Sequence, residues 1–233
     1  DLQNISITDD KITFGAGVTI TNVMEAIAPY HPSFAEMLRR YGSTQVRNAA
    51  TIGGNIANGS PIGDSPPALI ALGAMLHLRK GDVRRTIRLE DFFIQYGKQD
   101  RAAGEFVEAV SIPRQFDRLR CYKISKRFDQ DISAVCGCFN ITVVDNIVTT
   151  ATIAFGGMAG TPKRATSCEN ALLNKPWELN TVQKAMAMMA EDYDPMSDAR
   201  ASADYRLTTA QSLLLRYFHE DHGVQTSVLE VSA

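Results

Sequence analysis

The sequence predicts an α+β fold in two domains. In the first half, short strand-like segments with alternating apolar residues are interspersed with short helical patterns. In the second half, three long strand-like runs come first and helical patterns follow them. The chain has 233 residues, which is enough for two small domains. Because the composition shifts around residues 113–118, we expect a first domain at 1–115 and a second at 116–233.

The composition is typical of a soluble globular protein. Hydrophobic residues make up 45% of the chain and charged residues 21%. The formal net charge of −2 gives no basic footprint of the kind that nucleic-acid binding needs. No apolar run approaches the roughly 20 residues that span a bilayer, and no signal-peptide pattern opens the chain. The four irregularly spaced cysteines favour free thiols, so we expect a protein of the reducing cytoplasm.

Turn residues and apolar spacing place the elements of the first domain. Thr21 is expected to cap a helix over residues 22–28, and Pro32 to open a second helix that runs to Arg40. Strands are expected at the following positions, with the first two and the next two joined as hairpins: 5–7, 11–14, 75–79, 83–88 and 106–112.

The segment 47–67 is rich in glycine, proline and small residues, so it cannot be regular secondary structure over its whole length. Near its end, Asp64 or Ser65 is expected to cap a helix that continues through residues 68–72. The two prolines that follow the cap fit the first helical turn. This helix would therefore direct its N-terminus towards the glycine-rich segment.

The second domain is predicted to combine three long strands with a helical layer. The strands are expected at 121–126, 134–144 and 148–155, with Asp145-Asn146 as the tight turn between the last two. Helices are expected at 163–173, 178–191 and 203–220. The last of these carries its apolar residues on one helical stripe.

The most informative local pattern is Thr51-Ile52-Gly53-Gly54-Asn55. Two glycines without a Cβ allow close approach of the backbone to a ligand, and their free N–H groups can converge on an anion. Thr51 and Asn55 add short hydrogen-bonding side chains, and Asp64 is suited to gripping hydroxyl groups of a ribityl or ribose chain. These features favour a cradle for a nucleotide-like cofactor.

From the residues alone, this pattern has a second interpretation. A glycine pair also makes an ordinary tight turn. The spacing matches neither a Walker A loop nor the Gly-x-Gly-x-x-Gly fingerprint that follows a strand in dinucleotide-binding folds. A ligand-binding turn and a structural turn both remain open at this point.

A longer stretch around this pattern resembles a known family. The run QVRNAATIGGNIANGSPIGD, residues 45–64, closely resembles the second flavin motif of the xanthine dehydrogenase and molybdenum hydroxylase family. Downstream, CYK at 121–123 and RFDQDISAV at 127–135 are similar to the segment that borders the isoalloxazine ring. The run FGGMAGTPKRA at 155–165 resembles the xanthine dehydrogenase version of the C-terminal domain more than the carbon monoxide dehydrogenase version. The resemblance covers essentially the whole chain and points to the small iron–sulfur/FAD subunit of bacterial xanthine dehydrogenases.

The resemblance implies a fold and a set of FAD-binding residues. The fold would be the second part of a vanillyl-alcohol-oxidase-type FAD-binding domain, followed by a three-stranded antiparallel sheet with a helical layer. The residues that would hold the FAD phosphates are Thr51, Gly53, Gly54 and Asn55, and Asp64 would hold a FAD hydroxyl. The residues that would lie near its rings are Tyr41 on the adenine side, Phe106 and Val107 beside the flavin, and Lys123 within a hydrogen bond of the flavin ring.

Four of these residues also have an ordinary structural interpretation. Tyr41 fits a core position at a helix end, Phe106 and Val107 fit a strand, and Lys123 fits a solvated strand cation. The resemblance, and not the residue types, therefore assigns them to the flavin site.

The same resemblance implies a reaction shared among several centres. Oxidation of hypoxanthine or xanthine to urate at a molybdenum cofactor, held by a large partner subunit, would send electrons through two 2Fe–2S clusters to this FAD and on to NAD⁺. The chain lacks the family's earlier glycine-rich flavin loop and has no Cys-x₄-Cys-x₂-Cys spacing. An N-terminal iron–sulfur/FAD segment is therefore an expected partner.

No catalytic residue and no metal site is assigned to this chain. Cys136 and Cys138 lie two apart on a predicted strand, and two soft ligands without a third favour small core residues. The loop from Arg127 to Asp131 is the candidate neighbour for nicotinamide entry, because its charges lie close in sequence to Lys123.

Two alternative functions remain open. One is the flavin subunit of a related molybdenum hydroxylase, of the carbon monoxide dehydrogenase or aromatic hydroxylase type, which the substrate that reduces the complete complex would distinguish. The other is a non-enzymatic interaction module whose glycine turn is only structural. The absence of any flavin spectrum would identify that module.

Overall fold

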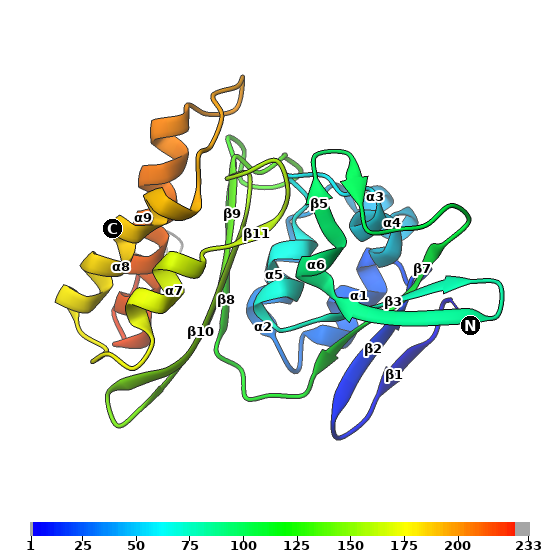
Figure 1. Ribbon diagram of the computed structural model, residues 1–233, viewed down its shortest axis with the longest axis horizontal. Helices are drawn as coiled ribbons and strands as arrows, with labels where there is room; N and C mark the ends of the chain where they lie inside the picture. The colour runs from blue at the N-terminus through cyan, green and yellow to red at the C-terminus, as the bar shows by residue number, and fades with distance from the viewer. Residues whose placement is uncertain (1, 227–233) are drawn as a thin grey trace.

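The computed structural model describes residues 2–226, which form antiparallel sheets and helices (Figure 1). The strands are β1 (Ile5–Ile7), β2 (Lys11–Gly15), β3 (Met75–Lys80), β4 (Val83–Arg88), β5 (Phe93–Gln95), β6 (Lys98–Gln99), β7 (Phe106–Pro113), β8 (Leu119–Ile124), β9 (Val135–Val144), β10 (Ile147–Gly156) and β11 (Lys163–Arg164). The helices are α1 (Ile20–Ile27), α2 (Pro32–Arg39), α3 (Thr44–Ala49), α4 (Ile52–Ala57), α5 (Ser65–Ala71), α6 (Leu89–Phe92), α7 (Thr166–Leu172), α8 (Leu179–Asp192) and α9 (Ala203–Asp221). The predicted α+β class is confirmed.

The first sheet has five strands in the order β1-β2-β7-β3-β4, and every neighbouring pair is antiparallel. Side chains alternate between its two faces because the strand period is two. One face places Ile12, Phe14, Leu76 and Val110 in a core that also includes buried residues of α1, α2, α4 and α5. The hairpins predicted at 5–14 and 75–88 are present, as is the strand predicted at 106–112.

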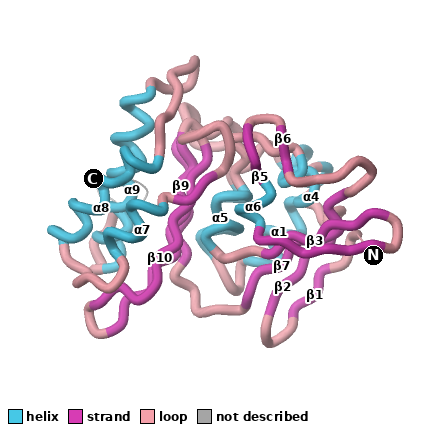
Figure 2. Tube along the Cα trace, in the orientation of Figure 1, coloured by secondary structure: helices cyan, strands magenta, loops and turns pink. Residues whose placement is uncertain are grey.

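The second sheet has four strands in the order β11-β10-β9-β8 and is buried on both faces. Cys136 and Cys138 of β9 belong to the same core as the first sheet and its helices. Phe139 and Phe155 point to the other face, into a core with α7, α8 and α9. Figures 1 and 2 show these strands standing between α5 on one side and α7 to α9 on the other. The sheet therefore joins both halves of the chain.

The turn between β9 and β10 follows the prediction. Asp145 and Asn146 have φ values of 49° and 61°, so both lie in the left-handed region. Two such residues are what a tight hairpin turn with a right-handed strand twist requires. The three long strands of the second domain are likewise confirmed.

The first helix starts earlier than predicted. Its N-cap is Thr19, whose side chain accepts a hydrogen bond from the Asn22 N–H at 3.3 Å, and not Thr21. The Thr21 hydroxyl instead donates to the Asn48 side chain at 2.6 Å, which links α1 to the end of α3. A cap depends on backbone direction, so two threonines that are close in sequence compete for it.

The helix predicted over 163–173 is wrong at its start. Lys163 and Arg164 form β11, which pairs with β10 and adds a fourth strand to the predicted three. The helix α7 begins only at Thr166. Backbone pairing with an available sheet edge outweighs the weak local preference of this segment.

The short elements α6, β5 and β6 were not predicted from the sequence. They span only two to four residues each, and they connect β4 to β7. Segments this short carry no measurable periodicity.

Candidate functional site

The predicted glycine turn is the first part of a short helix. Residues 52–55 belong to α4, and Thr51 is its N-cap, with a side chain that accepts from the Gly54 N–H at 3.1 Å. The N–H groups of Ile52, Gly53 and Asn55 donate to the carbonyl oxygens of Val18, Ala16 and Thr51. The expectation that these N–H groups are free to converge on an anion is therefore wrong.

The two glycines of α4 have different surroundings. A Cβ built on Gly53 would clash with Ala16, at 2.7 Å from its Cα and 2.7 Å from its carbonyl oxygen. A Cβ on Gly54 would meet only the Thr51 hydroxyl, at 3.0 Å. Gly53 thus serves close packing of α4 against the segment after β2, whereas the backbone at Gly54 is open to approach from outside.

The side chain of Asn55 connects α4 to two neighbouring segments. Its Oδ1 accepts a short hydrogen bond from the Ser65 hydroxyl, at the start of α5. Its Nδ2 lies 3.4 Å from the Tyr41 hydroxyl, which is a long contact. Tyr41, predicted on the adenine side, and Asn55, predicted at the phosphates, are therefore neighbours.

The second group of predicted residues meets at a buried ion pair. Lys123 Nζ on β8 donates to Asp64 Oδ2 at 2.7 Å and to Ser133 Oγ at 2.8 Å, and the Ser133 hydroxyl donates to Asp64 Oδ1 at 2.5 Å. Lys123 is 3% exposed, Asp64 4% and Ser133 1%. An ammonium group has three donors, so one N–H of Lys123 is left for a further acceptor.

This arrangement corrects two details. Lys123 is not a solvated strand cation. Asp64 precedes α5 at its N-cap position, but its side chain makes no capping hydrogen bond and instead accepts one hydrogen bond at each oxygen, from Lys123 and from Ser133. Ser133 was missed as a site residue, although it lies inside the 127–135 run.

The loop after β8 is fastened to the end of α2 by Arg40. The Arg40 guanidinium lies 4.8 Å from the centre of the Phe128 ring, and its Nε donates to the Phe128 carbonyl at 2.7 Å. Gln130, whose φ is 52°, donates its N–H to the Arg40 carbonyl at 3.2 Å. Burial lowers the pKa of the Arg40 guanidinium. Sequence reasoning missed Arg40, because nothing local relates it to a loop 88 residues away.

Within the same loop, Arg127 and Asp131 interact with each other. The Arg127 N–H donates to the Asp131 carboxylate at 2.9 Å, and this bond holds the pKa of the carboxyl below its usual value. The Arg127 side chain remains 72% exposed. Its guanidinium is thus presented to solvent at a loop whose backbone is held in place.

Phe106 and Val107 lie in the first sheet, on β7, and not in the sheet that carries Lys123. Phe106 is 38% exposed and Val107 6%. Their neighbour Glu108 accepts at its carbonyl from the Ala16 N–H at 2.9 Å, next to the place where Ala16 contacts Gly53. β7 therefore adjoins α4, while Lys123 adjoins α5.

Several cavities lie around the described part of the molecule. A cavity of about 810 Å³ runs beside β8, where Lys123, Arg40 and Phe128 contribute to its lining. A second, of about 640 Å³, lies between residues 60–62 and the segment 194–206 of the second half.

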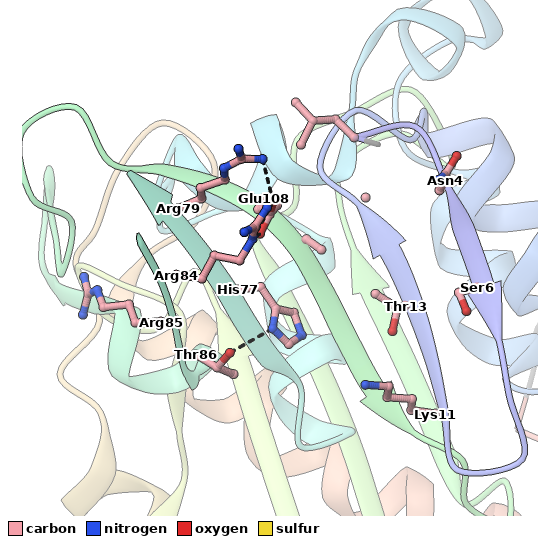
Figure 3. A pocket seen from close by; sticks show the side chains of 13 residues that line it. Asn4, Ser6, Lys11, Thr13, His77, Arg79, Arg84, Arg85, Thr86 and Glu108 are labelled. Atoms are coloured by element: carbon pink, nitrogen blue, oxygen red, sulfur yellow. Dashed lines mark hydrogen bonds and ion pairs between the residues drawn. The ribbon is translucent and has the colours of Figure 1, made fainter. Parts of the chain in front are cut away.

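The third cavity, of about 550 Å³, covers the polar face of the first sheet and contains none of the predicted site residues (Figure 3). In it, Glu108 pairs with Arg79 and Arg84, and His77 hydrogen-bonds to Thr86 at 2.9 Å. Burial lowers the pKa of the His77 ring.

Arg206 is a second buried cation that the sequence did not reveal. It is 1% exposed, and its Nη1 donates to the carbonyl oxygens of Ala134 and Gly157. Its Nη2 donates to Asp198 at 2.7 Å. Gly157 has a φ of 84°, and a Cβ there would clash with the Ala134 carbonyl, so glycine is required. Arg206 thus anchors α9 to the loops at the ends of β9 and β10.

Two findings describe absences in the part of the chain that the structure covers. Among residues 2–226, no group of three or more His, Cys, Asp or Glu side chains is arranged to hold a metal ion. Over the same residues, no helix has the length and apolar character needed to cross a membrane.

Comparison with known proteins gives the family. The family described as FAD binding domain in molybdopterin dehydrogenase matches residues 1–115, and the one described as CO dehydrogenase flavoprotein C-terminal domain matches residues 120–221. The chain thus consists of a FAD-binding domain followed by a flavoprotein C-terminal domain. It belongs to the molybdenum hydroxylase family, and its first part is the FAD-binding domain of that family.

Individual relatives agree with this placement. Nicotinate hydroxylase hnxS of Emericella nidulans is 34% identical over 196 residues, which is 80% of this chain and 14% of the relative. Xanthine dehydrogenase 1 of Arabidopsis thaliana is 29% identical over 94% of this chain and 17% of its own length. The nicotine 6-hydroxylase medium subunit of Paenarthrobacter nicotinovorans is 28% identical over 92% of this chain and 76% of the subunit. The chain therefore spans less than a fifth of the first two relatives and about three quarters of the third.

Solved structures give the same fold. A chain of the carbon monoxide dehydrogenase from Hydrogenophaga pseudoflava superimposes with a TM-score of 0.85 at 27% identity, over 92% of this chain and 76% of that one. A chain of the cyanide-inactivated Cu,Mo-CO dehydrogenase gives 0.84 at 26% identity, over the same shares. This chain thus has the architecture of the two carbon monoxide dehydrogenase chains, and it is also similar in sequence to xanthine dehydrogenases.

Proposed function

We propose that this chain holds FAD and passes electrons from purine oxidation, hypoxanthine or xanthine to urate, on to NAD⁺. The observation that carries the proposal is the buried contact between Lys123 and Asp64, which places two predicted FAD-binding residues together at the junction of the two halves. When bound, FAD supplies the chemistry that accepts electrons singly and releases them as a hydride. The protein's part is to bind the FAD, to orient it and to shield it.

The surroundings of Gly54 fit an approaching phosphate group. The Thr51 hydroxyl accepts from the Gly54 N–H and keeps its own proton for donation, and Asn55 Nδ2 has a second hydrogen beyond its long contact to Tyr41. In this proposal Thr51 and Asn55 hold the phosphates through side chains, with Gly54 leaving room. Gly53 contributes by packing α4 against Ala16.

The remaining predicted residues would surround the rest of the cofactor. Asp64 would accept from a hydroxyl of FAD, and Lys123 would donate its third N–H near the flavin ring. Tyr41 is proposed on the adenine side, with Phe106 and Val107 beside the flavin. Tyr41 is supported by its position next to Asn55. Phe106 and Val107 are supported by the hydrogen bond from Ala16 to Glu108 on the same strand, because Ala16 also packs against Gly53.

The first experiment is a visible absorption spectrum of the complete subunit. We expect flavin bands in the native protein, and their loss in Gly54→Val, whose side chain would occupy the open face of α4. Gly160→Ala is the matched control, since a Cβ there makes only an ordinary 3.6 Å contact with Tyr96. A colourless native subunit that takes up no added FAD would favour a non-enzymatic interaction module.

The electron acceptor is proposed to enter beside the loop from Arg127 to Asp131. The support is the exposed Arg127 guanidinium on a loop that Arg40 fastens down near Lys123. Unchanged NAD⁺ kinetics in Arg127→Ala of the complete enzyme would remove this assignment.

The purine substrate and the partners rest on resemblance. We propose a molybdenum-binding large subunit, an N-terminal iron–sulfur/FAD segment, a cytoplasmic location, and domain limits of 1–115 and 116–233. The alternative is a flavin subunit of a related hydroxylase, and its support is the fold shared with the carbon monoxide dehydrogenase chains. Reducing the complete complex in turn with xanthine, nicotinate and carbon monoxide, and following flavin bleaching, separates these cases.

A further inference from the structure

Three of the four cysteines gather where the second sheet meets the first core. Cys121 lies on β8, and Cys136 and Cys138 lie on β9. Cys136 and Cys138 are fully buried, and all three are free thiols. The fourth, Cys168, belongs to the other core, on α7.

Cys121 and Cys138 are direct partners in the β8–β9 register. The Cys121 N–H points away from β9, because it donates to the Ser33 hydroxyl of α2 at 2.8 Å. An antiparallel pair whose N–H groups point away from each other is of the non-hydrogen-bonded kind, with a Cα separation of about 4.5 Å. A disulfide bridges Cα atoms about 4.4–6.8 Å apart, so this pair meets the requirement without backbone movement.

The two side chains lie on the same face of the sheet, because directly paired residues of neighbouring antiparallel strands point to the same side. Cys136 turns elsewhere, since its Sγ lies 3.5 Å from Met37 Sδ and 3.8 Å from the Asp64 carbonyl. Its cross-strand partner is Lys123, so Cys136 has no cysteine opposite to it.

One of the two cysteines borders a cavity. Cys121 is partly exposed and contributes to the lining of the cavity of about 810 Å³ beside β8. Cys138 is covered behind it. Burial raises the pKa of the Cys121 thiol, so little thiolate is present near neutral pH and the reaction is slow compared with that of an exposed cysteine.

We propose that Cys121 and Cys138 form a dithiol that a hydroperoxide oxidises to an intramolecular disulfide. The Cys121 sulfur attacks one peroxide oxygen, the O–O bond breaks, and with hydrogen peroxide a sulfenic acid and one water form. The Cys138 sulfur then attacks the sulfenic sulfur, and a second water leaves. The two thiols lose two protons and two electrons, which the peroxide takes up.

The disulfide constrains β8, the strand that carries Lys123. The disulfide joins β8 to β9 two residues before the lysine that binds Asp64. This inference does not depend on FAD binding, because added peroxide is the oxidant and the thiols are the readout.

The test is to treat the reduced complete subunit with hydrogen peroxide, unfold it, count thiols and map peptides by mass spectrometry. We expect the loss of two thiols and two hydrogen atoms, with one cross-linked peptide pair joining Cys121 to Cys138. Dithiothreitol should reverse it. Cys136→Ser and Cys168→Ser should still form the cross-link, whereas Cys121→Ser and Cys138→Ser should not.

Three results would overturn the proposal. One is a cross-link through Cys136. Another is over-oxidation of Cys121 to a sulfinic acid while Cys138 stays reduced. The third is retention of both the Cys121 and the Cys138 thiol, read from their peptides, after prolonged treatment with excess peroxide. Each of these can be read from the wild-type protein, so the conclusion does not depend on whether a variant folds.

Discussion

Lys123 Nζ lies 2.7 Å from Asp64 Oδ2, and these two side chains form an ion pair that is almost completely buried between β8 and the start of α5. The residues are 59 positions apart in the sequence. Ser133 bonds to both partners, so each charge is offset by hydrogen bonds as well as by its counterion. Such a pair persists only when its geometry repays the desolvation of both charges.

Breaking this ion pair should strongly destabilise the protein. Asp64→Asn leaves the Lys123 ammonium buried without a counterion, and we expect a loss of about 3–5 kcal/mol in the free energy of unfolding. Urea denaturation of the complete subunit would measure it. The control is Glu36→Gln, which removes the exposed partner of Arg39 and should cost less than about 1 kcal/mol. Equal small losses in both variants would show that the buried ion pair contributes no more to the free energy of unfolding than the exposed one.

The two glycines of α4 should respond differently to alanine. Gly53→Ala forces a methyl group against Ala16, and overpacking of this kind costs about 1–3 kcal/mol. Gly54→Ala meets only the Thr51 hydroxyl and should leave the free energy of unfolding nearly unchanged. Thermal unfolding of both variants measures the difference. A larger loss in Gly54→Ala than in Gly53→Ala would contradict the packing role of Gly53.

Arg206 should contribute more to stability than its neighbour Arg200. Arg206→Met leaves the carbonyls of Ala134 and Gly157 without their buried donor, and an unsatisfied buried group costs about 1–3 kcal/mol. Arg200→Met removes only a long 3.7 Å pair with Asp198 near the surface, so we expect less than about 1 kcal/mol. Chemical denaturation should rank the two variants in this order, and the reverse order would rule out the anchoring role.

Arg40→Ala should loosen the loop that follows β8. The variant removes the contact with the Phe128 ring and the hydrogen bond to its carbonyl, worth together about 1–2 kcal/mol. Amide hydrogen exchange in residues 126–131 should therefore accelerate by about 5–30-fold. Arg88→Ala, which removes surface pairs with Glu90 and Asp91 away from this loop, serves as the control and should leave these amides unchanged. Equal exchange in both variants would mean that the loop is held by other contacts.

Acid should weaken the protein partly through Glu105. Its hydrogen bond from Arg85 lowers the pKa of the Glu105 carboxyl from 4.5 to about 2. A group whose pKa is lower in the folded state adds stability above its unfolded value, and this contribution is lost as the pH falls from 4.5 towards 2. Glu105→Gln should therefore flatten the dependence of the unfolding midpoint on pH in that window. An unchanged slope would show that other carboxyl groups govern acid unfolding.

Local chemistry was enough to predict most of the longer regular elements of this protein. The turn at Asp145 and Asn146, the proline at the start of α2 and the apolar stripe of α9 each act within a few residues, so the sequence reveals them directly. The α+β class and the molybdenum hydroxylase family also follow from the sequence, since a long motif carries its own specificity.

Only the tertiary structure decided how the site is assembled. The choice of Thr19 over Thr21 as a cap and the pairing of β11 with β10 depend on how the chain packs, which local residue preferences do not specify. The same is true of the N–H groups of α4, which donate within the protein. Lys123 could be solvated or buried until β8 was placed against α5, because burial of a charge is decided by the partners that folding brings to it.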